Sequence, residues 1–256
     1  MVKTPSKLYK YCYFDPEGNF LKGLKANTIF FSDPKKFNDP FDSNPNLIRI
    51  IIGEGPETTQ AINRLFKDAP TDIQEEAKLY SEDQHRSMII MSYKKTMNNL
   101  YSKIGVSSFS ENYDNNVMWH YYAKEHTGFV LEFDANSDFF KRKFAVNYTK
   151  DFPLIIGNEL GMEGESISLA NKVFLNKSPE WAHETEWRLL GDGVGKSISY
   201  IPNTLLGIYL GKDCSDQNEL LIRSNLNNDS LSYVKLMKMK IKDFSFKLEP
   251  IELNNL

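Results

Sequence analysis

A long helical stretch, expected at about residues 56–102, interrupts a chain whose other segments are patterned mainly as short strands. Apolar residues recur every three or four positions across 58–69, which is the spacing that places them on one face of a helix. Residues 71–74 then have the form of a capping box, which predicts a second, longer helix running toward residue 100. We therefore expect a helical insertion beside a strand-rich core.

The remaining segments alternate between strand and helix patterns on both sides of this stretch. Short apolar or alternating runs predict strands at 7–14, 28–31, 104–109, 128–133, 143–149, 196–201, 207–210, 232–240 and 244–250. Helical spacing predicts a helix at 116–126 capped by Asp114 or Asn115, one at 163–176 with Ile167, Ala170 and Phe174 inward, and one at 216–226. Because no repeat, low-complexity tract or linker divides the chain, the pattern predicts a single α+β domain over residues 1–256.

Composition narrows the setting in which such a domain would work. The net charge of -3 supplies no overall field that would draw the protein to nucleic acid or to an anionic membrane. The two cysteines, Cys12 and Cys214, lie far apart, so neither a disulfide framework nor a zinc site is indicated. The N-terminal residues lack the apolar run of a signal peptide, and no run is long enough to span a bilayer. We therefore expect a cytoplasmic protein without a membrane partner.

Two acidic residues, Glu184 and Glu186, are the most informative candidates for chemistry. If their segment is a strand, its period of two places both carboxylates on one face, with Thr185 and Trp187 on the other. Such a pair suits a cleft in which one carboxylate bonds a sugar hydroxyl and the other orients a nucleophile. The alternative is an edge strand whose charges prevent edge-to-edge pairing.

Other polar residues suggest a site less specifically. Ser108 and Ser110 end a predicted strand just before a helix, where they could hold a polar ligand or simply cap that helix. His120 and His126 are six residues apart, so they lie on different helix faces and do not predict a metal pair; packed histidines are the simpler interpretation. His126 also suits the negative end of a helix, where a protonated imidazole is favoured.

Familiar catalytic motifs are missing from the chain. The sequence contains no GxGxxG, no GxxxxGK[ST], no HExxH, no paired CxxC and no GxSxG. Nucleotide-triphosphate hydrolysis, zinc-dependent hydrolysis and a serine triad are therefore not first choices.

Several motifs, taken in order, resemble the bacterial uncharacterised family DUF2971. They are Leu8-Tyr9-Lys10-Tyr11, Phe37-Asn38-Asp39-Pro40-Phe41, Ser108-Phe109-Ser110, Met118-Trp119-His120-Tyr121-Tyr122-Ala123, His126-Thr127-Gly128-Phe129 and Trp181 with Glu184-Thr185-Glu186-Trp187-Arg188. The resemblance spans nearly the whole chain, but this family name carries no function.

More distantly, the order of these pieces resembles the ADP-ribosyltransferase superfamily. That resemblance implies a mixed, mainly antiparallel split sheet, with a basic residue on a first strand, a Ser-x-Ser motif on a second and Glu-x-Glu on a third. Lys10, then Ser108 with Ser110, then Glu184 with Glu186 would fill these places. The chain departs from the pattern at Lys10, because the superfamily usually has arginine or histidine there and lysine offers a point charge instead of a planar fork.

The same resemblance implies a role for each residue. Glu186 would stabilise the charge that develops on the ribose when NAD loses nicotinamide, and Glu184 would orient or deprotonate the acceptor. The serines would brace the ribose, Lys10 would meet phosphate, and Tyr122 or Trp119 would stack on the nicotinamide. The residues expected to bind the dinucleotide are Lys10, Tyr11, Asn38, Ser108, Ser110, Trp119, Tyr122, His126 and Arg188.

We therefore expect an ADP-ribosyltransferase-like enzyme or NAD glycohydrolase that acts on an unidentified acceptor. It would be a toxin or phage-defence effector, with an antitoxin or defence protein as a candidate partner and with no metal. One alternative is a sensor module that binds a nucleotide or peptide without turning it over. Another is a nuclease that uses Glu184, Glu186 and Asp39 with a magnesium ion.

Overall fold

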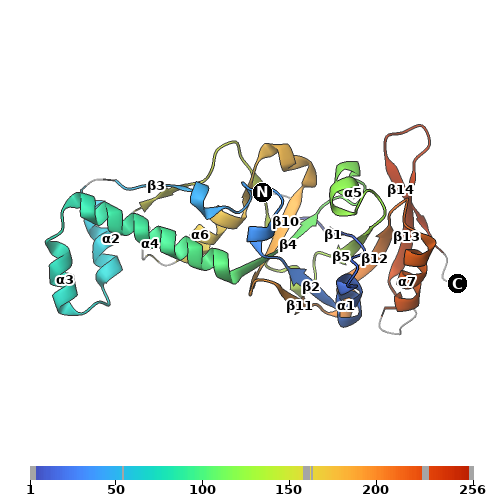
Figure 1. Ribbon diagram of the computed structural model, residues 1–256, viewed down its shortest axis with the longest axis horizontal. Coiled ribbons are helices and arrows are strands. Elements are labelled where there is room, and N and C mark those ends of the chain that lie inside the picture. The colour runs from blue at the N-terminus through green and yellow to red at the C-terminus, as the bar shows by residue number, and fades with distance from the viewer. Residues whose placement is uncertain (1–3, 54, 158–161, 163, 227–230, 254–256) are drawn as a thin grey trace. The chain divides into compact units, whose positions relative to one another are not determined.

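The chain divides into two compact units, and each is built from segments that are separated in sequence. The computed structural model describes residues 4–53, 55–157, 162, 164–226 and 231–253 (Figure 1). Unit 1 comprises Met1–Ser32, Gly105–Val146 and Glu180–Leu256, and unit 2 comprises Asp33–Ile104 and Asn147–Pro179. The helices expected at 56–102 fall in unit 2, while the single-domain organisation stays a prediction.

Unit 1 contains the large sheet. The strands of unit 1 are β1 (Lys7–Cys12), β2 (Thr28–Phe31), β4 (Ile104–Ser110), β5 (Phe129–Asp134), β6 (Phe144–Ala145), β10 (Glu186–Asp192), β11 (Lys196–Ser199), β12 (Leu205–Leu210), β13 (Lys235–Ile241) and β14 (Leu248–Glu252). Its α-helices are α1 (Asn19–Ala26), α5 (Asn116–Tyr122) and α7 (Asp216–Leu226).

The main sheet has eight strands in the order β14-β13-β12-β5-β1-β4-β10-β6. Strand β12 runs parallel to β13, whereas β5 is antiparallel to both β1 and β12, so the sheet is mixed and mainly antiparallel. Together with the helices this confirms the predicted α+β class. The basic, serine and glutamate segments singled out in the sequence lie on β1, β4 and β10, which are consecutive strands of this sheet.

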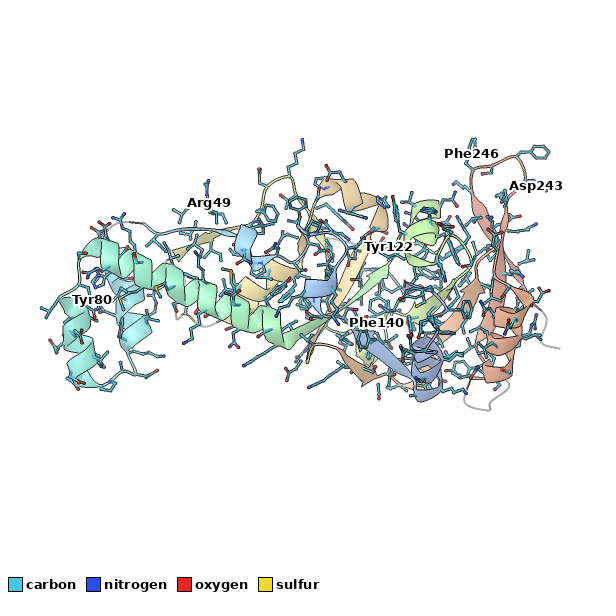
Figure 2. All side chains as sticks on the ribbon, in the orientation of Figure 1. Arg49, Tyr80, Tyr122, Phe140, Asp243 and Phe246 are labelled. Carbon is cyan, nitrogen blue, oxygen red and sulfur yellow. The ribbon has the colours of Figure 1, made fainter. Side chains whose placement is uncertain are left out.

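Both faces of the sheet are covered, which explains why four of the six residues of β1 are apolar or aromatic. Leu8 belongs to a core that includes Leu24 of α1, Ile222 of α7 and Phe140, which is labelled in Figure 2. Tyr9, the next residue along β1, points to a second core that includes Trp119 of α5. Since successive side chains of a strand face opposite ways, one short strand supports both layers.

The junction between β1 and β4 differs from its neighbours. Strand β1 pairs with β5 along its whole length, from Lys7 opposite Asp134 to Cys12 opposite Phe129. Against β4, the register consists of Tyr9 opposite Ser110. Beyond that pair, the Ser108 carbonyl of β4 accepts from a side chain of β1, that of Lys10.

Unit 2 is mostly helical. Its elements are α2 (Pro56–Phe66), α3 (Thr71–Lys78), α4 (Glu82–Lys103), α6 (Glu165–Phe174) and the short strands β3 (Arg49–Ile51), β7 (Asn147–Tyr148), β8 (Leu154–Ile156) and β9 (Asn176–Lys177). Helix α4 packs against α2 and α6. Its residues Ile89, Tyr93 and Met97 recur every four positions and are buried, as an amphipathic helix requires.

The helical region corrects one prediction. The expected long helix after residue 71 is two helices, because α3 ends at Lys78 and α4 begins at Glu82. Residues 71–74 form no capping box, since Pro70 is the N-cap and it has no side-chain donor or acceptor. The capping box instead joins Ser81 and Gln84 at the start of α4.

Other boundaries also differ from the pattern. Helix α5 is capped by Asn115 as predicted, but it ends at Tyr122 because Lys124, Glu125 and His126 all have left-handed backbone angles. In α6, Phe174 is buried as predicted, but Ile167 is exposed, and the other buried residues are Leu169 and Val173. The predicted start of that helix, residue 163, lies outside the described residues.

Several predicted strands are also shorter than expected. The strand expected at 143–149 is interrupted and appears as β6 and β7. The strand expected at 244–250 begins at Leu248, because the residues before it form the turn of a hairpin. In the part of the chain that the structure describes, no helix combines the length and the apolar character needed to cross a membrane.

Candidate functional site

The two glutamates lie at the beginning of β10, but they do not share a strand. Glu184 ends a short 3-10 helix, Pro179–Glu184, and Glu186 is the first residue of β10. Thr185 between them has a φ of 42°, a left-handed conformation that a β-branched residue rarely adopts. The prediction of one strand face is therefore wrong, since the left-handed residue breaks the period of two. Both glutamates are nevertheless buried, with exposed fractions of 2% and 5%.

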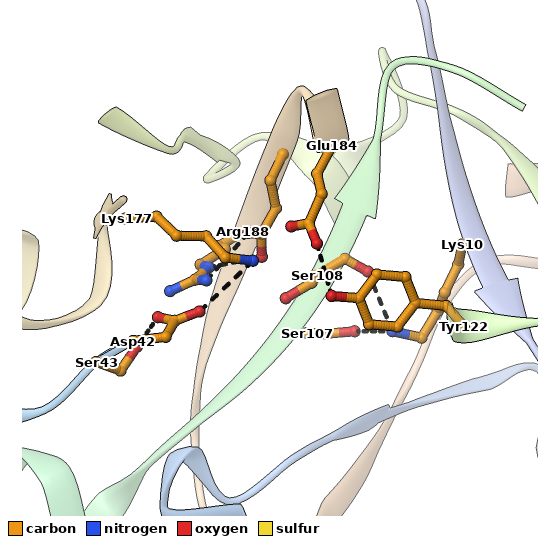
Figure 3. Close-up of polar contacts among 10 residues, drawn as sticks. Lys10, Asp42, Ser43, Ser107, Ser108, Tyr122, Lys177, Glu184 and Arg188 are labelled. Carbon is orange, nitrogen blue, oxygen red and sulfur yellow. Dashed lines mark hydrogen bonds and ion pairs between the residues drawn. The ribbon is translucent and has the colours of Figure 1, made fainter. Parts of the chain in front are cut away.

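Glu184 is held from two directions. The hydroxyl of Tyr122, on α5, donates to Glu184 Oε1 at 2.6 Å (Figure 3). The hydroxyl of Ser110, at the end of β4, donates to the Glu184 carbonyl at 2.7 Å. Asn115, the cap of α5, also donates to the carbonyl of His183 at 2.7 Å. The carboxylate is thus fixed by a phenol, while its backbone is fixed by the strand and helix beside it.

The strained Thr185 is fixed in the same way. Asn112 Nδ2 donates to Thr185 Oγ1 at 3.1 Å, and the backbone N–H of Glu111 donates to the Thr185 carbonyl at 3.3 Å. An unfavourable backbone conformation persists only where its surroundings over-determine it, and such residues cluster at functional sites. The left-handed turn aims Glu184 and Glu186 in directions that a regular strand could not provide.

Glu186 forms a buried ion pair with Arg188. The Nε and one terminal nitrogen of the guanidinium donate to the two carboxylate oxygens at 2.7 and 3.0 Å. The two side chains lie on the same face of β10, and Arg188 is only 1% exposed. Trp187 faces the other way, into the core, and its indole N–H donates to Glu111 Oε1 at 2.7 Å. Arg188 therefore sets the plane of the Glu186 carboxylate through two parallel bonds.

The side chain of Lys10 extends from β1 to the neighbouring strand β4. Its ammonium donates to Ser107 Oγ at 3.0 Å and to the Ser108 carbonyl at 3.2 Å, and it lies 5.0 Å from the centre of the Phe109 ring. Burial lowers the pKa of Lys10, and the nearby Cys12 and Glu186 oppose this shift. In this conformation the Lys10 ammonium is not positioned for the expected phosphate contact, because it donates hydrogen bonds to β4.

Three other predicted binding residues support α5. The Tyr11 hydroxyl donates to the Asn112 carbonyl at 2.9 Å and accepts from the Asn115 N–H at 3.3 Å. Trp119 is fully buried, its indole N–H donates to the Tyr113 carbonyl at 2.7 Å, and its ring packs between Tyr11 and His126. The predicted stacking of Trp119 on a ligand is therefore wrong, since neither face of the indole is open.

His126 also differs from expectation. Burial lowers the pKa of its imidazole, and the neighbouring Lys212 lowers it further, whereas Asp213 opposes them. Helix α5 ends four residues earlier, at Tyr122, so the helix terminus does not favour a protonated ring at this position. His126 instead stacks on Trp119, with ring centres 6.1 Å apart.

Two predicted residues belong to unit 2. Asn38 is exposed, and Asp39 is buried with its Oδ1 accepting from the Phe41 N–H at 2.9 Å, as in an Asx turn. Among the described residues, no three histidine, cysteine, aspartate or glutamate side chains are grouped so that they could hold a metal ion.

A third buried glutamate, Glu132 on β5, was not singled out in the sequence. It is 4% exposed, accepts from the Tyr209 hydroxyl, and pairs with Lys7 at 2.7 Å. Burial raises the pKa of Tyr209, and its hydrogen bond to Glu132 adds to the shift. Tyr9 and Tyr113 pack around the Tyr209 ring, so this polar group is enclosed by aromatic rings.

Sequence reasoning also missed Ser107, Asn112 and Thr185 as supports of the site. Ser107 and Phe109 are two positions apart, so they share the face of β4 that Lys10 contacts. The strand period could therefore have indicated Ser107. No local signal marks Thr185, because its conformation depends on partners more than seventy positions earlier in the chain.

Comparison with known proteins covers part of this site. No curated protein and no solved structure matches the chain. The resemblance to ADP-ribosyltransferases stays a prediction. The model of a family described as protein of unknown function, DUF2971, matches residues 118–189, which run from α5 to β10 and include Glu184, Glu186 and Arg188. For that segment the chain is therefore similar to DUF2971, as the sequence motifs predicted.

Proposed function

We propose that the protein is an ADP-ribosyltransferase-like enzyme that cleaves the bond between nicotinamide and ribose in NAD. The ADP-ribose would pass to an acceptor, which is either a macromolecule, a small molecule or water. This proposal rests on one observation. Lys10, the β4 serines and the buried Glu186 lie on three consecutive strands of one sheet, and the buried Glu184, just before the third strand, is bonded to Ser110 of β4.

The chemistry asks for a fixed negative charge at the ribose. When the C1′–N bond breaks, its electron pair leaves with neutral nicotinamide and positive charge develops on the ribose ring. The Glu186 carboxylate, held in place by Arg188, would stabilise that charge and accept a hydrogen bond from a ribose hydroxyl.

Glu184 would act on the acceptor. A carboxylate that takes the acceptor's proton lets the acceptor oxygen or nitrogen form the new bond to C1′, and the overall reaction releases nicotinamide and one proton. Tyr122 would position Glu184 through its hydroxyl, and Ser110 would do so through the Glu184 carbonyl. In this proposal Tyr122 is a positioning residue, which differs from the stacking role expected from the sequence.

The test is release of nicotinamide from NAD labelled in the nicotinamide ring. Wild-type protein should release it, whereas Glu186→Gln should lose turnover by about a hundredfold or more while still binding NAD. Glu180→Gln is the matched control, because Glu180 is exposed on the 3-10 helix that carries Glu184. A second label in the ADP-ribose identifies the acceptor. No release from wild-type protein with cell extract as acceptor, or equal turnover by Glu186→Gln, contradicts the proposal.

A binding module without catalysis is the second candidate, and one observation favours it. Both carboxylates already have internal partners, Tyr122 for Glu184 and Arg188 for Glu186, as polar groups with a purely supporting role would have. Under this alternative the protein would bind a nucleotide, and Glu186→Gln would change affinity with no turnover to lose. Slower growth on expression of wild-type protein, absent with Glu186→Gln, would favour the enzyme.

A further inference from the structure

The hairpin between β13 and β14 carries two phenylalanines at its tip that contact almost nothing. Phe244 and Phe246 are fully exposed, and the neighbouring Ile241 is 62% exposed (Figure 2). Soluble proteins show scattered exposed apolar residues, but a group of large ones on a protruding turn usually marks a contact surface. Residues 241–247 are called the hairpin tip below.

Hydrogen bonds hold the hairpin tip in a defined conformation. The Lys242 N–H donates to the Lys247 carbonyl at 2.9 Å and the Ser245 N–H to the Lys242 carbonyl at 3.2 Å. Asn116, at the start of α5, donates from Nδ2 to the Phe246 carbonyl at 3.0 Å. Phe244 itself has a left-handed φ of 54°, which these bonds maintain. Both rings are therefore presented outward without a large ordering cost on binding.

Lysines bracket the two rings. Lys242 precedes them and Lys247 follows them, both exposed, and Asp243 is the acidic residue between. One strand position further back, Lys240 is paired with Glu249 at 3.0 Å. The hairpin tip is thus locally cationic, although the whole chain has a net charge of -3.

We propose that the hairpin tip binds the surface of an anionic phospholipid bilayer. Phe244 and Phe246 would enter the boundary between headgroups and acyl chains, while Lys242 and Lys247 would meet lipid phosphates just above it. Lysine suits this position, because its long apolar stem can follow the rings while the ammonium stays among the headgroups. This surface departs from the expectation of no membrane partner.

The size of the tip favours lipid over a folded protein partner. Two phenylalanine rings bury roughly 300–500 Å², whereas a stable protein interface buries about 800 Å² on each side. A bilayer requires no complementary pocket, so two rings and two lysines are sufficient for a reversible surface contact. The proposed contact is independent of the NAD site.

Co-sedimentation with vesicles tests the proposal directly. The full chain should sediment with vesicles of phosphatidylglycerol and phosphatidylethanolamine and much less with phosphatidylcholine alone. Phe244→Ser with Phe246→Ser should lower the partition coefficient by about tenfold or more, because both rings lose their apolar transfer. Lys242→Gln with Lys247→Gln should lower it several-fold at low salt and remove most of its salt dependence.

Leu79→Ser is the matched control. Leu79 is an exposed apolar residue of unit 2, at 84%, and its replacement should leave sedimentation unchanged. The hairpin variants should keep the urea unfolding midpoint of wild-type protein, which shows that they fold. No sedimentation with anionic vesicles, equal sedimentation with phosphatidylcholine, or an unchanged double phenylalanine variant overturns the proposal. Binding of the tip only to a protein would overturn it as well.

Discussion

Unit 1 contains two buried glutamate clusters, one around Glu132 and one formed by Glu184 and Glu186. Their differences help to distinguish a supporting role from the proposed catalytic role. Glu132 lies in the middle of β5, in regular register with β1 and beside a register shift in β12, with a tyrosine and a lysine as partners. Glu184 and Glu186 lie where a strand begins, on both sides of a left-handed residue, with a tyrosine and an arginine as partners. Burial of a carboxylate is common to both clusters, so burial alone does not identify a site.

The difference lies in the backbone and in what converges on it. Glu132, Tyr209 and Lys7 have no left-handed backbone angle, whereas the Glu184 and Glu186 cluster maintains an unfavourable one at Thr185 through bonds from Ser110 and Asn112. Strain that is held by several distant residues points to a function that requires the geometry. We therefore assign the chemistry to the second cluster and a supporting role to Glu132.

The largest expected effect on stability comes from the arginine partner. Arg188→Ala leaves the Glu186 charge buried without compensation, which should lower the free energy of unfolding by about 3–5 kcal/mol. Lys7→Ala at Glu132 should cost about 1 kcal/mol or less, because half of the Lys7 side chain is exposed. All three tryptophans lie in unit 1, so urea unfolding followed by tryptophan fluorescence reports on both variants. Equal losses would remove the distinction between the clusters.

Removing the tyrosine hydroxyls sharpens the comparison. Tyr122→Phe and Tyr209→Phe each leave a buried carboxylate with one donor fewer, so each should cost about 1–3 kcal/mol of stability. NAD turnover should fall about tenfold in Tyr122→Phe alone, because that hydroxyl positions Glu184. Similar turnover in the two variants would show that Tyr122 does not position a catalytic group.

The smallest effect concerns Lys10 and appears as a pH dependence. Burial lowers the pKa of Lys10 in the folded protein, so the unfolded chain keeps this proton up to higher pH than the folded chain does. The free energy of unfolding of wild-type protein should therefore rise, relative to Lys10→Met, as pH increases from the lowered pKa toward about 10.4, the ordinary lysine value. Urea titrations between pH 7 and pH 10.5 measure the difference. Parallel curves over this range would show that Lys10 is not desolvated.

Local patterns predicted much of the fold. Strand β2 and helix α7 have the predicted bounds, and Asn115 caps α5, because each depends on residues close together in sequence. The alternation along β10 also follows from the sequence, since Glu186 and Arg188 share one face and Trp187 takes the other. The capping box is at Ser81 and not at the predicted Thr71, because the N-cap of α3 is Pro70.

The candidate site was only partly predictable, because its geometry depends on contacts between distant residues. The pairing of Tyr122 with Glu184 joins residues 62 positions apart, and no local pattern distinguishes it from stacking on a ligand. The burial of Trp119 likewise depends on Tyr11 and His126 packing around it. The alternation of Phe244, Phe246 and Leu248 resembles a strand, but the hydrogen bond from Lys242 to Lys247 closes a turn there.

The central claim is that the cluster at the start of β10, and not the one on β5, carries NAD chemistry. The most direct test compares nicotinamide release by wild-type protein, Glu186→Gln and Glu132→Gln at saturating NAD. The account predicts a loss of about a hundredfold or more in Glu186→Gln and turnover within about threefold of wild type in Glu132→Gln, whose side chain pairs with Tyr209 and Lys7. Equal turnover in all three proteins, or loss in Glu132→Gln alone, would contradict it.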